Sequence, residues 1–213
     1  MDPSIEPIPE WLDTADELAR TLLEAARPVR FRLATTPGEL EAVFRLRYRV
    51  TVERGWRGSE EMPDGLERDG YDDEHAAQIA GWDGEVLAAC ARVVYPVPGR
   101  PLPTEAAFGI VAEPAGRVAD AGRLIVAPEY RGGRHTILGG LSAGIWIAMS
   151  ERGYRWVAVA LTERMIELSQ SLGFEIRRLG PSREHGGDMR VPALMSAPNP
   201  GAWLPGQGAG AMT

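Results

Sequence analysis

The segment RLIVAPEYRGGRHTILGGLSAGIWIAM, residues 123–149, constrains the fold more than any other part of the chain. An apolar strand runs into Pro128, an arginine- and glycine-rich turn follows, and a long apolar helix begins near residue 134. Backbone N–H groups at a helix N-terminus attract phosphate, and glycine lets the backbone approach it closely. Arginines in such a turn add bidentate contacts. The segment predicts a pyrophosphate-binding strand–loop–helix; an ordinary strand–helix turn with glycines for chain reversal is the alternative.

Hydrophobic periodicity predicts the other elements. Thr36-Pro37-Gly38-Glu39 is a helix start, with a Thr cap and a Glu three residues later. Asp83-Gly84 indicates a two-residue hairpin turn. We expect helices at 11–26, 36–53, 104–111, 134–152 and 163–172, and strands at 29–34, 75–82, 85–95, 118–127, 155–161, 174–179 and 189–195. Antiparallel strands in the first part of the chain are followed by a β-α-β-α-β order in the second. This order predicts an α/β fold with a mixed central sheet flanked by helices.

The length suits one domain with additions at its ends. We expect an N-terminal helical extension over residues 1–28, a single domain over 29–197, and a flexible Gly/Pro-rich tail over 198–213. The sequence shows no long apolar run and no secretory start, which predicts a cytoplasmic protein without stable membrane insertion. The single cysteine, Cys90, lies in an apolar run and is expected to be a packed core thiol.

The charge is distributed unevenly along the chain. Residues 1–116 hold 22 acids and 12 arginines, whereas residues 117–213 hold 8 acids and 11 arginines, and lysine is absent. An acidic half suits a cationic ligand and a basic half suits phosphates, although solvated faces give the same composition. No dense arginine stripe with interleaved aromatic residues is present, so nucleic-acid binding is not expected.

A group of charged residues in the first half forms a second candidate site. Three carboxylates lie within six residues of a long polar loop, and leaving them unpaired in the fold would be costly. One interpretation is a buried ionic floor balanced by arginines; the other is that spare carboxylate charge holds a cationic acceptor, with Trp56 closing over it. Carboxylates also suit hard cations, but the spacing lacks an EF-hand pattern and no metal is expected. The charged residues are Glu67, Asp69, Asp72, Arg47, Arg92 and Arg123.

The segment 123–149 resembles the acyl-CoA-binding motif of the GNAT superfamily, R-G-x-G-x-G/A after a strand ending V-x-P. The likeness continues through the strand WVAVALT, the helix ERMIELSQSL and Gly173-Phe174. The resemblance implies that backbone groups near Ile125 and Val126 hold the thioester carbonyl. It also implies that the donor phosphate is bound by Arg131, Gly132, Gly133 and Arg134. Two departures are that Arg134 and Thr136 replace later glycines of the loop, and that residues 162–172 lack the tyrosine that many GNAT enzymes use as leaving-group acid.

The first half resembles the acyl-homoserine-lactone synthases, the autoinducer-producing branch of that fold. LRYRVTVERGW supplies Arg47 and Trp56, E-R-D-G-Y-D supplies the E-x-D-x-x-D acids, and Asp120-x-x-Arg123 matches E-x-x-R. Arg92 matches the hairpin arginine. The resemblance covers about residues 30–180. It departs at Thr51, where the family has Phe, and Trp56 stands one position early. N-acyl amino acid synthases belong to the same branch.

This resemblance implies an N-acyltransferase in which an amine attacks an acyl thioester. We expect Asp120 to act as the general base, with Glu67 as the second candidate. The implied donor is acyl-CoA or the phosphopantetheine of an acyl carrier protein, and S-adenosylmethionine is the acceptor that the resemblance suggests. An acidic carrier protein would dock on Arg131, Arg134, Arg152 and Arg155. Alternatives are an N-acetyltransferase acting on a small amine or peptide, an N-acyl amino acid synthase, and a non-catalytic GNAT-like binding module.

Overall fold

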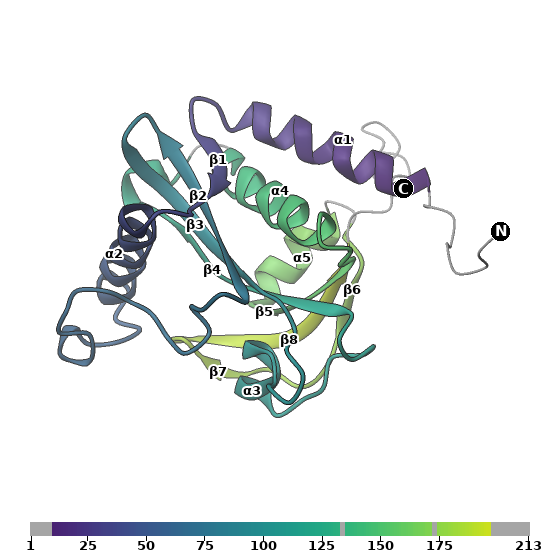
Figure 1. The fold of residues 1–213 in the computed structure, drawn as a ribbon. Helices are drawn as coiled ribbons and strands as arrows, with labels where there is room; N and C mark the ends of the chain where they lie inside the picture. The colour runs from purple at the N-terminus through teal and green to yellow at the C-terminus, as the bar shows by residue number, and fades with distance from the viewer. Residues whose placement is uncertain (1–9, 133–134, 172–173, 197–213) are drawn as a thin grey trace, which may run out of the picture.

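The computed structural model describes residues 10–132, 135–171 and 174–196 (Figure 1). The predicted tail 198–213 therefore lies outside the described residues. The helices are α1 (Glu10–Ala25), α2 (Pro37–Glu53), α3 (Pro103–Phe108), α4 (Thr136–Ser150) and α5 (Glu163–Ser171), with short 3-10 turns η1 (Ser59–Glu61) and η2 (Pro128–Tyr130). The strands are β1 (Arg30–Leu33), β2 (Ala76–Asp83), β3 (Val86–Val94), β4 (Val118–Val126), β5 (Trp156–Leu161), β6 (Ile176–Arg178), β7 (Arg183–His185) and β8 (Asp188–Ser196).

The strands form one mixed sheet in the order β1-β2-β3-β4-β5-β8-β6, with β7 pairing to β8. Only β4 and β5 pair in parallel among the described strands. The predicted α/β class with a mixed sheet is confirmed. Strand β7 was not predicted. The β2–β3 turn consists of Gly84 and Glu85, one residue later than predicted, because Asp83 still pairs with Val86.

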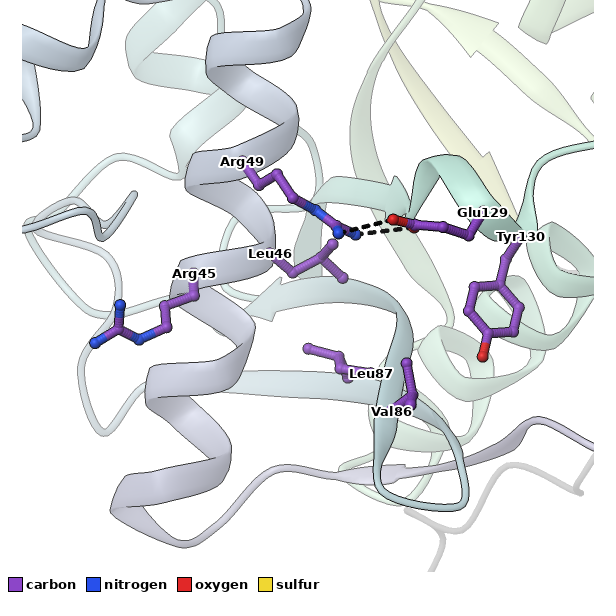
Figure 2. Close-up of a pocket in the computed structure, with 7 residues that line it drawn as sticks. All are labelled: Arg45, Leu46, Arg49, Val86, Leu87, Glu129 and Tyr130. Atoms are coloured by element: carbon purple, nitrogen blue, oxygen red, sulfur yellow. Dashed lines mark hydrogen bonds and ion pairs between the residues drawn. The ribbon is translucent and has the colours of Figure 1, made fainter.

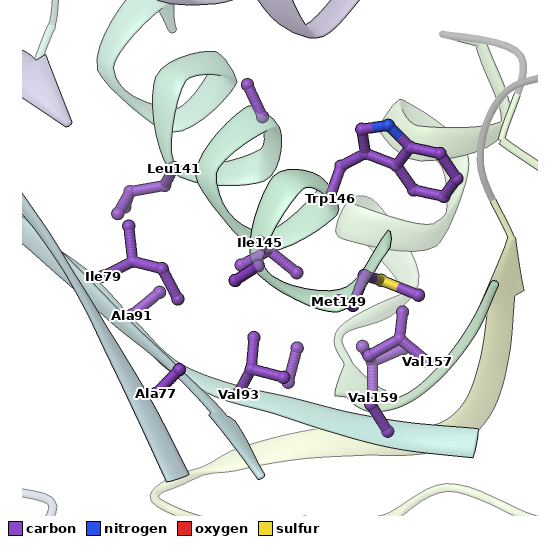
Figure 3. Packing of buried hydrophobic residues seen from close by; sticks show 14 of the residues in the cluster. Ala77, Ile79, Ala91, Val93, Leu141, Ile145, Trp146, Met149, Val157 and Val159 are labelled. Atoms are coloured by element: carbon purple, nitrogen blue, oxygen red, sulfur yellow. The ribbon is translucent and has the colours of Figure 1, made fainter. Parts of the chain in front are cut away.

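Helices cover both faces of the sheet (Figure 1). On one face α4 packs against the central strands and α1 packs over α4, where Trp146 Nε1 donates to Asp16 Oδ1 at 2.8 Å. Figure 3 shows the apolar contact between α4 and the sheet. Val157 and Val159 belong to this core, where both are buried among other apolar side chains. The N-terminal helix thus adds to the main core.

Glycines allow α4 to lie close to the sheet. A Cβ on Gly140 would come within 2.2 Å of the Phe31 ring, and one on Gly144 would come within 2.7 Å of Ile79 Cγ2. Phe31 also leaves no room for a Cβ on Gly81 of β2, at 2.6 Å. Because close-packed cores tolerate added volume poorly, these glycines fix the position of α4, the helix that follows the predicted donor loop.

The other face carries α2 and α3. Helix α2 begins as predicted, with Thr36 accepting from the N–H of Glu39 and the Glu39 carboxylate accepting from the N–H of Thr36. Val43, Leu46 and Val50 of this helix pack over Cys90. Cys90 is fully buried, as predicted, and burial raises the pKa of its thiol to about 12. It is therefore a core residue and not a nucleophile.

Candidate active site

Strands β4 and β5 separate part-way along the sheet. They pair only from Val118 opposite Trp156 to Asp120 opposite Ala158, although β4 continues to Val126. Beyond this point β4 contains a bulge, in which Arg123 adopts a positive φ of 55° and the β3–β4 register shifts between Cys90 and Arg92. Among the described residues, no strand pairs with the β5-facing edge of β4 at 122–126. Backbone groups there have no partner strand, and apart from the Val126 carbonyl, which accepts a hydrogen bond from Arg131 Nε, they can bind a ligand.

A cavity of about 320 Å³ lies against this stretch of β4. It brings together predicted donor-binding residues, Ile125, Val126 and Arg131, and the predicted acceptor residue Trp56. Its lining also includes Arg54 and Asp188, which were not predicted. Arg54 ends α2 just before Trp56, and the Gly-Gly-Asp sequence at 186–188 is the turn signal that could have revealed the β7–β8 hairpin. We call this cavity the cleft.

Arg131 lies beside Ile125 and Val126 in the cleft and is engaged within the protein. Its Nε donates to the carbonyl of Val126 at 3.0 Å, and its Nη1 lies 2.8 Å from Glu53 Oε1. Gly132 adopts a φ of +106° and no other atom would lie within 4 Å of a Cβ there, so its backbone is accessible as a phosphate-binding loop requires. The predicted donor residues Gly133 and Arg134 lie outside the described residues.

Trp56 is held by the β7–β8 hairpin. The guanidinium of Arg190 lies 5.8 Å from the centroid of the Trp56 ring, and a Cβ on Gly187 would come within 2.3 Å of Trp56 Cδ1. Burial and the charges of Arg190 and Arg123 lower the pKa of His185, which places the hairpin close to Arg123. The turn at the end of β7 is therefore a wall of the cleft, and it sets the position of the indole ring.

Replacing Gly187 with alanine is expected to displace Trp56 and to weaken acceptor binding. The added Cβ meets the indole, and the φ of +76° is strained for any residue with a side chain. We expect the KM for the acceptor to rise about tenfold, with little change in the KM for the donor. Gly186→Ala is the matched control, because Gly186 has a similar φ of +59° but open space around it. Equal effects of the two substitutions would show that backbone strain alone is responsible.

The charged residues predicted from the first half form a closed ring beside the cleft, which we call the ionic floor. Arg47, at the buried side of α2, contacts Glu67 and also binds Asp72 with two hydrogen bonds of 2.8 and 3.0 Å. Arg92 binds Asp69 at 2.6 and 3.1 Å and also lies 3.0 Å from Asp72. Arg123 completes the ring by contacting Glu67 at 3.0 Å and Asp69 at 2.8 Å. Each arginine thus joins two carboxylates, and each carboxylate joins two arginines.

The arginines hold the floor carboxylates in the ionised form. Burial alone would raise the pKa of Glu67, but the charges of Arg47 and Arg123 outweigh it and lower that pKa. The pKa values of Asp69 and Asp72 are lowered in the same way by Arg92, Arg123 and Arg47. Arg47 is completely buried and Arg92 almost so. The floor interpretation of these residues is therefore confirmed, and the ring contains no unpaired carboxylate for a cationic acceptor.

Asp120 lies on the same strand as Arg123 but outside the ring. Its Oδ2 accepts a hydrogen bond of 2.8 Å from the N–H of Thr104, in the first turn of α3. Burial raises the pKa of Asp120 to about 6, although the hydrogen bonds from Thr104 oppose this change. Asp120 is not among the residues that line the cleft. The two predicted bases thus differ in kind: Glu67 has a lowered pKa, and Asp120 a raised one.

A second hollow, of about 490 Å³, opens on the outer side of α2 (Figure 2). Arg45, Leu46 and Arg49 face the β2–β3 hairpin tip and η2 across it. Arg49 forms a bidentate ion pair with Glu129, with distances of 2.9 and 3.0 Å. None of the predicted site residues lines this hollow.

Comparison with known proteins identifies the domain. Residues 46–139 match the family model described as "Acetyltransferase (GNAT) domain". This part of the chain is thus similar to a GNAT acetyltransferase domain. The match begins in α2 and ends in α4, so it contains the ionic floor, the separated edge of β4 and the donor loop.

Solved structures show the same fold. The CoA-dependent acyl-homoserine lactone synthase MesI superposes with a TM-score of 0.66 at 24% identity, over 81% of this chain and 91% of MesI. The corresponding enzyme BjaI, solved with SAM and isopentyl-CoA, gives 0.63 at 21% identity, over 74% and 75% of the two chains. FeeM, an N-acyl amino acid synthase from uncultured soil microbes, gives 0.54 at 16% identity, over 80% and 90%. These structures show that the chain has the GNAT fold, and the family-model match supports an acyltransferase.

Two further properties concern the described residues only. Within 10–132, 135–171 and 174–196, no helix is both long and apolar enough to span a membrane. The same residues contain no group of three or more His, Cys, Asp or Glu side chains arranged to hold a metal ion.

Proposed function

We propose that the protein transfers an acyl chain from a thioester donor to the amine of a small, amino-acid-like acceptor. The observation that carries this proposal is the cleft, where the free edge of β4 and Arg131 on the donor side face Trp56 on the acceptor side. The ionic floor and the cleft together fit the autoinducer-synthase pattern of residues better than the pattern of a binding module. Backbone groups near Ile125 and Val126 would polarise the thioester carbonyl.

The reaction is a direct displacement. The amine nitrogen forms a bond to the thioester carbon, the C–S bond breaks, and the products are an amide and a free thiol. One proton leaves the amine for a protein base, and the departing thiolate takes up a proton. Arg47, Arg92 and Arg123 remain paired to the floor carboxylates throughout, so they act by fixing the position of β4, the acidic loop and α2.

Asp120 is the better of the two base candidates. A base needs a carboxylate whose pKa lies near the working pH, and that of Asp120 is raised to about 6. Glu67 accepts from Arg47 and Arg123, and both oxygens are engaged. Its lowered pKa makes it a poor proton acceptor. Because Asp120 does not line the cleft, we propose that it takes the proton through a water molecule.

The donor is a thioester of coenzyme A or of an acyl carrier protein. Arg131 and Arg152, two of the arginines considered for carrier docking, do not belong to one patch, because α4 places 15 residues, about 22 Å of helix, between them. The guanidinium of Arg152 also lies 4.1 Å from the centroid of the Tyr95 ring. A carrier protein docked at the cleft would therefore meet Arg131 but not Arg152. This favours acyl-CoA as the donor to test first.

The proposal is tested by an assay that combines each acyl donor with each acceptor. Purified protein is offered acetyl-CoA, medium-chain acyl-CoA or acyl carrier protein thioesters, each with S-adenosylmethionine or free amino acids, and products are identified by mass spectrometry. We expect amide formation with a medium-chain donor. Turnover with acetyl-CoA alone would instead indicate an N-acetyltransferase, and activity that persists without S-adenosylmethionine would indicate an N-acyl amino acid synthase. A folded protein inactive in every combination would be a binding module, and the proposal would be wrong.

A further inference from the structure

The hollow on the outer side of α2 takes no part in the proposed reaction. It lies between α2, the tip of the β2–β3 hairpin and η2 (Figure 2). Its volume of about 490 Å³ is within the range of small-molecule sites and exceeds the volume of the cleft. The hollow and the cleft have no lining residue in common. A ligand in the hollow would therefore leave the donor and acceptor positions free.

The base of the hollow is apolar and is held in place without a ligand. Leu46 is 5% exposed, and it packs in an apolar cluster against which Leu87 and Tyr130 also lie. The Tyr130 hydroxyl donates to Asp83 Oδ2 at 3.0 Å, which ties η2 to the end of β2. Val86, at the hairpin tip, is 56% exposed. An apolar chain that covered Val86 and Leu87 would gain free energy from the buried surface.

Arg49 is the cation that faces this apolar base. It reaches across the hollow to Glu129, whereas Arg45 is directed away from Glu129 (Figure 2). Glu129 accepts from Nη1 and Nη2 of Arg49, and Nε has no hydrogen-bond partner among the residues that the structure describes. The side chains of Arg49 and Glu129 are 49% and 58% exposed, so this ion pair contributes little and exchanges readily. The Nε and Nη2 groups can therefore donate to a further carboxylate.

The charges around the hollow restrict the class of ligand. A cation would be repelled by the guanidinium of Arg49. A doubly charged phosphate would be repelled by Glu129 more strongly than a carboxylate, which carries one charge and can share Arg49 with Glu129. The apolar base next to Arg49 adds the requirement for an apolar chain. The ligand that meets both conditions has one carboxylate and one apolar chain.

We infer that the hollow is a second ligand site, at which Arg49 binds the carboxylate of an amphiphilic monocarboxylate while Leu87 and Val86 contact its chain. Two sources supply this chemistry: a free fatty acid and an N-acylated amino acid. The inference goes beyond the proposed acyl transfer and does not depend on it, because the site is defined by binding alone. It assigns a function to a part of the molecule that the proposed reaction does not use.

Isothermal titration calorimetry on the full-length protein tests this site. The probes are octanoate, as the free fatty acid, and N-octanoylglycine, as the N-acylated amino acid, both below their micelle-forming concentrations. We expect one equivalent of at least one acid to bind. Acetate lacks the chain and 1-octanol lacks the charge, so each should bind at least about tenfold more weakly. The acid that binds more tightly identifies the source of the ligand.

Two substitutions at one ion pair should change the affinity in opposite directions. Arg49→Gln removes the cation and should weaken binding of the acid about 10- to 100-fold, the range of a charged hydrogen bond. Glu129→Gln removes the competing carboxylate and should tighten binding about two- to fivefold. Arg178→Gln is the matched control, because Arg178 forms a similarly exposed bidentate pair with Glu163 and lines neither cavity. This variant should bind the acid as the wild type does.

Three outcomes would overturn the inference. If the wild type bound neither acid, the hollow would not be a site for this class of ligand. Weaker binding in both Arg49→Gln and Glu129→Gln would show that the ion pair acts only by holding η2 against α2. Binding that Arg49→Gln leaves unchanged would place the acid elsewhere, and its loss in Arg131→Gln would identify the cleft. Each result can be read in a protein without acyltransferase activity, so failure of the proposed function is a separate finding.

Discussion

Replacing Arg47 with methionine should lower the free energy of unfolding by about 3–5 kcal/mol, because it leaves two buried carboxylates with a missing partner. Arg47 is completely buried and contacts both Glu67 and Asp72, whose own side chains are almost fully covered. Methionine replaces the volume of the side chain but none of its hydrogen bonds. Chemical denaturation at neutral pH, followed by circular dichroism, measures the difference.

The control for this substitution lies two residues earlier on α2. Arg45→Met removes an ion pair to Glu41 in which both side chains are more than half exposed, so a change within about 0.5 kcal/mol is expected. Adding Asp72→Asn to Arg47→Met should recover part of the lost stability, because it removes the excess negative charge that the loss of Arg47 leaves in the buried floor. If Arg47→Met were as stable as the wild type, the ionic floor would not be the structural element that we describe.

Replacing Asp120 with asparagine should lower kcat/KM by about 10²- to 10⁴-fold, the usual contribution of a general base. In the wild type, kcat/KM should rise with pH through about 6, where Asp120 loses its proton, and the variant should lack this limb. Asparagine keeps a carbonyl oxygen that accepts from the N–H of Thr104, so α3 stays anchored. Asp73→Asn, an isosteric change at a partly exposed ion pair with Arg100, is the control and should retain the wild-type profile.

The same substitution should raise stability. The folded-state pKa of Asp120 lies above its ordinary value of 3.8, so folded protein holds a proton that unfolded protein releases between about pH 4 and about pH 6. The free energy of unfolding therefore falls as pH rises through that window and stays lower above it. The asparagine side chain does not titrate, so Asp120→Asn should be more stable than the wild type by about 2–3 kcal/mol near pH 7. Full activity with an intact acidic limb would rule Asp120 out as the base.

The sequence predicts the order of the main helices and strands, including β4 and α4 on either side of the expected donor loop, and the six residues of the ionic floor. These predictions succeed because local patterns carry them: a capping box at Thr36, alternating apolar residues in the strands, and carboxylates that must find arginines in a folded chain. The closed arrangement of the ring could not be predicted, since it depends on the bulge at Arg123 and on the register of β3 with β4.

The β7–β8 hairpin, which forms a wall of the cleft, was not predicted from the sequence for a different reason. Strand β7 is three residues long, and its residues, Arg183, Glu184 and His185, are polar, so it carries no hydrophobic pattern. Its importance comes from a tertiary contact between Gly187 and Trp56, which lie far apart in the sequence. That Arg54 and Asp188 line the same cavity likewise becomes apparent only in the folded chain.

The ionic floor also affects how the chain folds during synthesis. Its contacts join residues 20 to 56 positions apart, and both bonds of Arg123 reach back more than 50 residues, to Glu67 and Asp69. Because a polypeptide emerges from the ribosome N-terminus first, the acidic loop is made well before Arg123 can neutralise it. The first half of the chain therefore carries excess negative charge for the first seconds after its synthesis. Repulsion between these charges opposes premature collapse. The ionic floor can form only after β4, which carries Arg123, has emerged. A truncated product that ends before β4 would therefore not form a stable ionic floor.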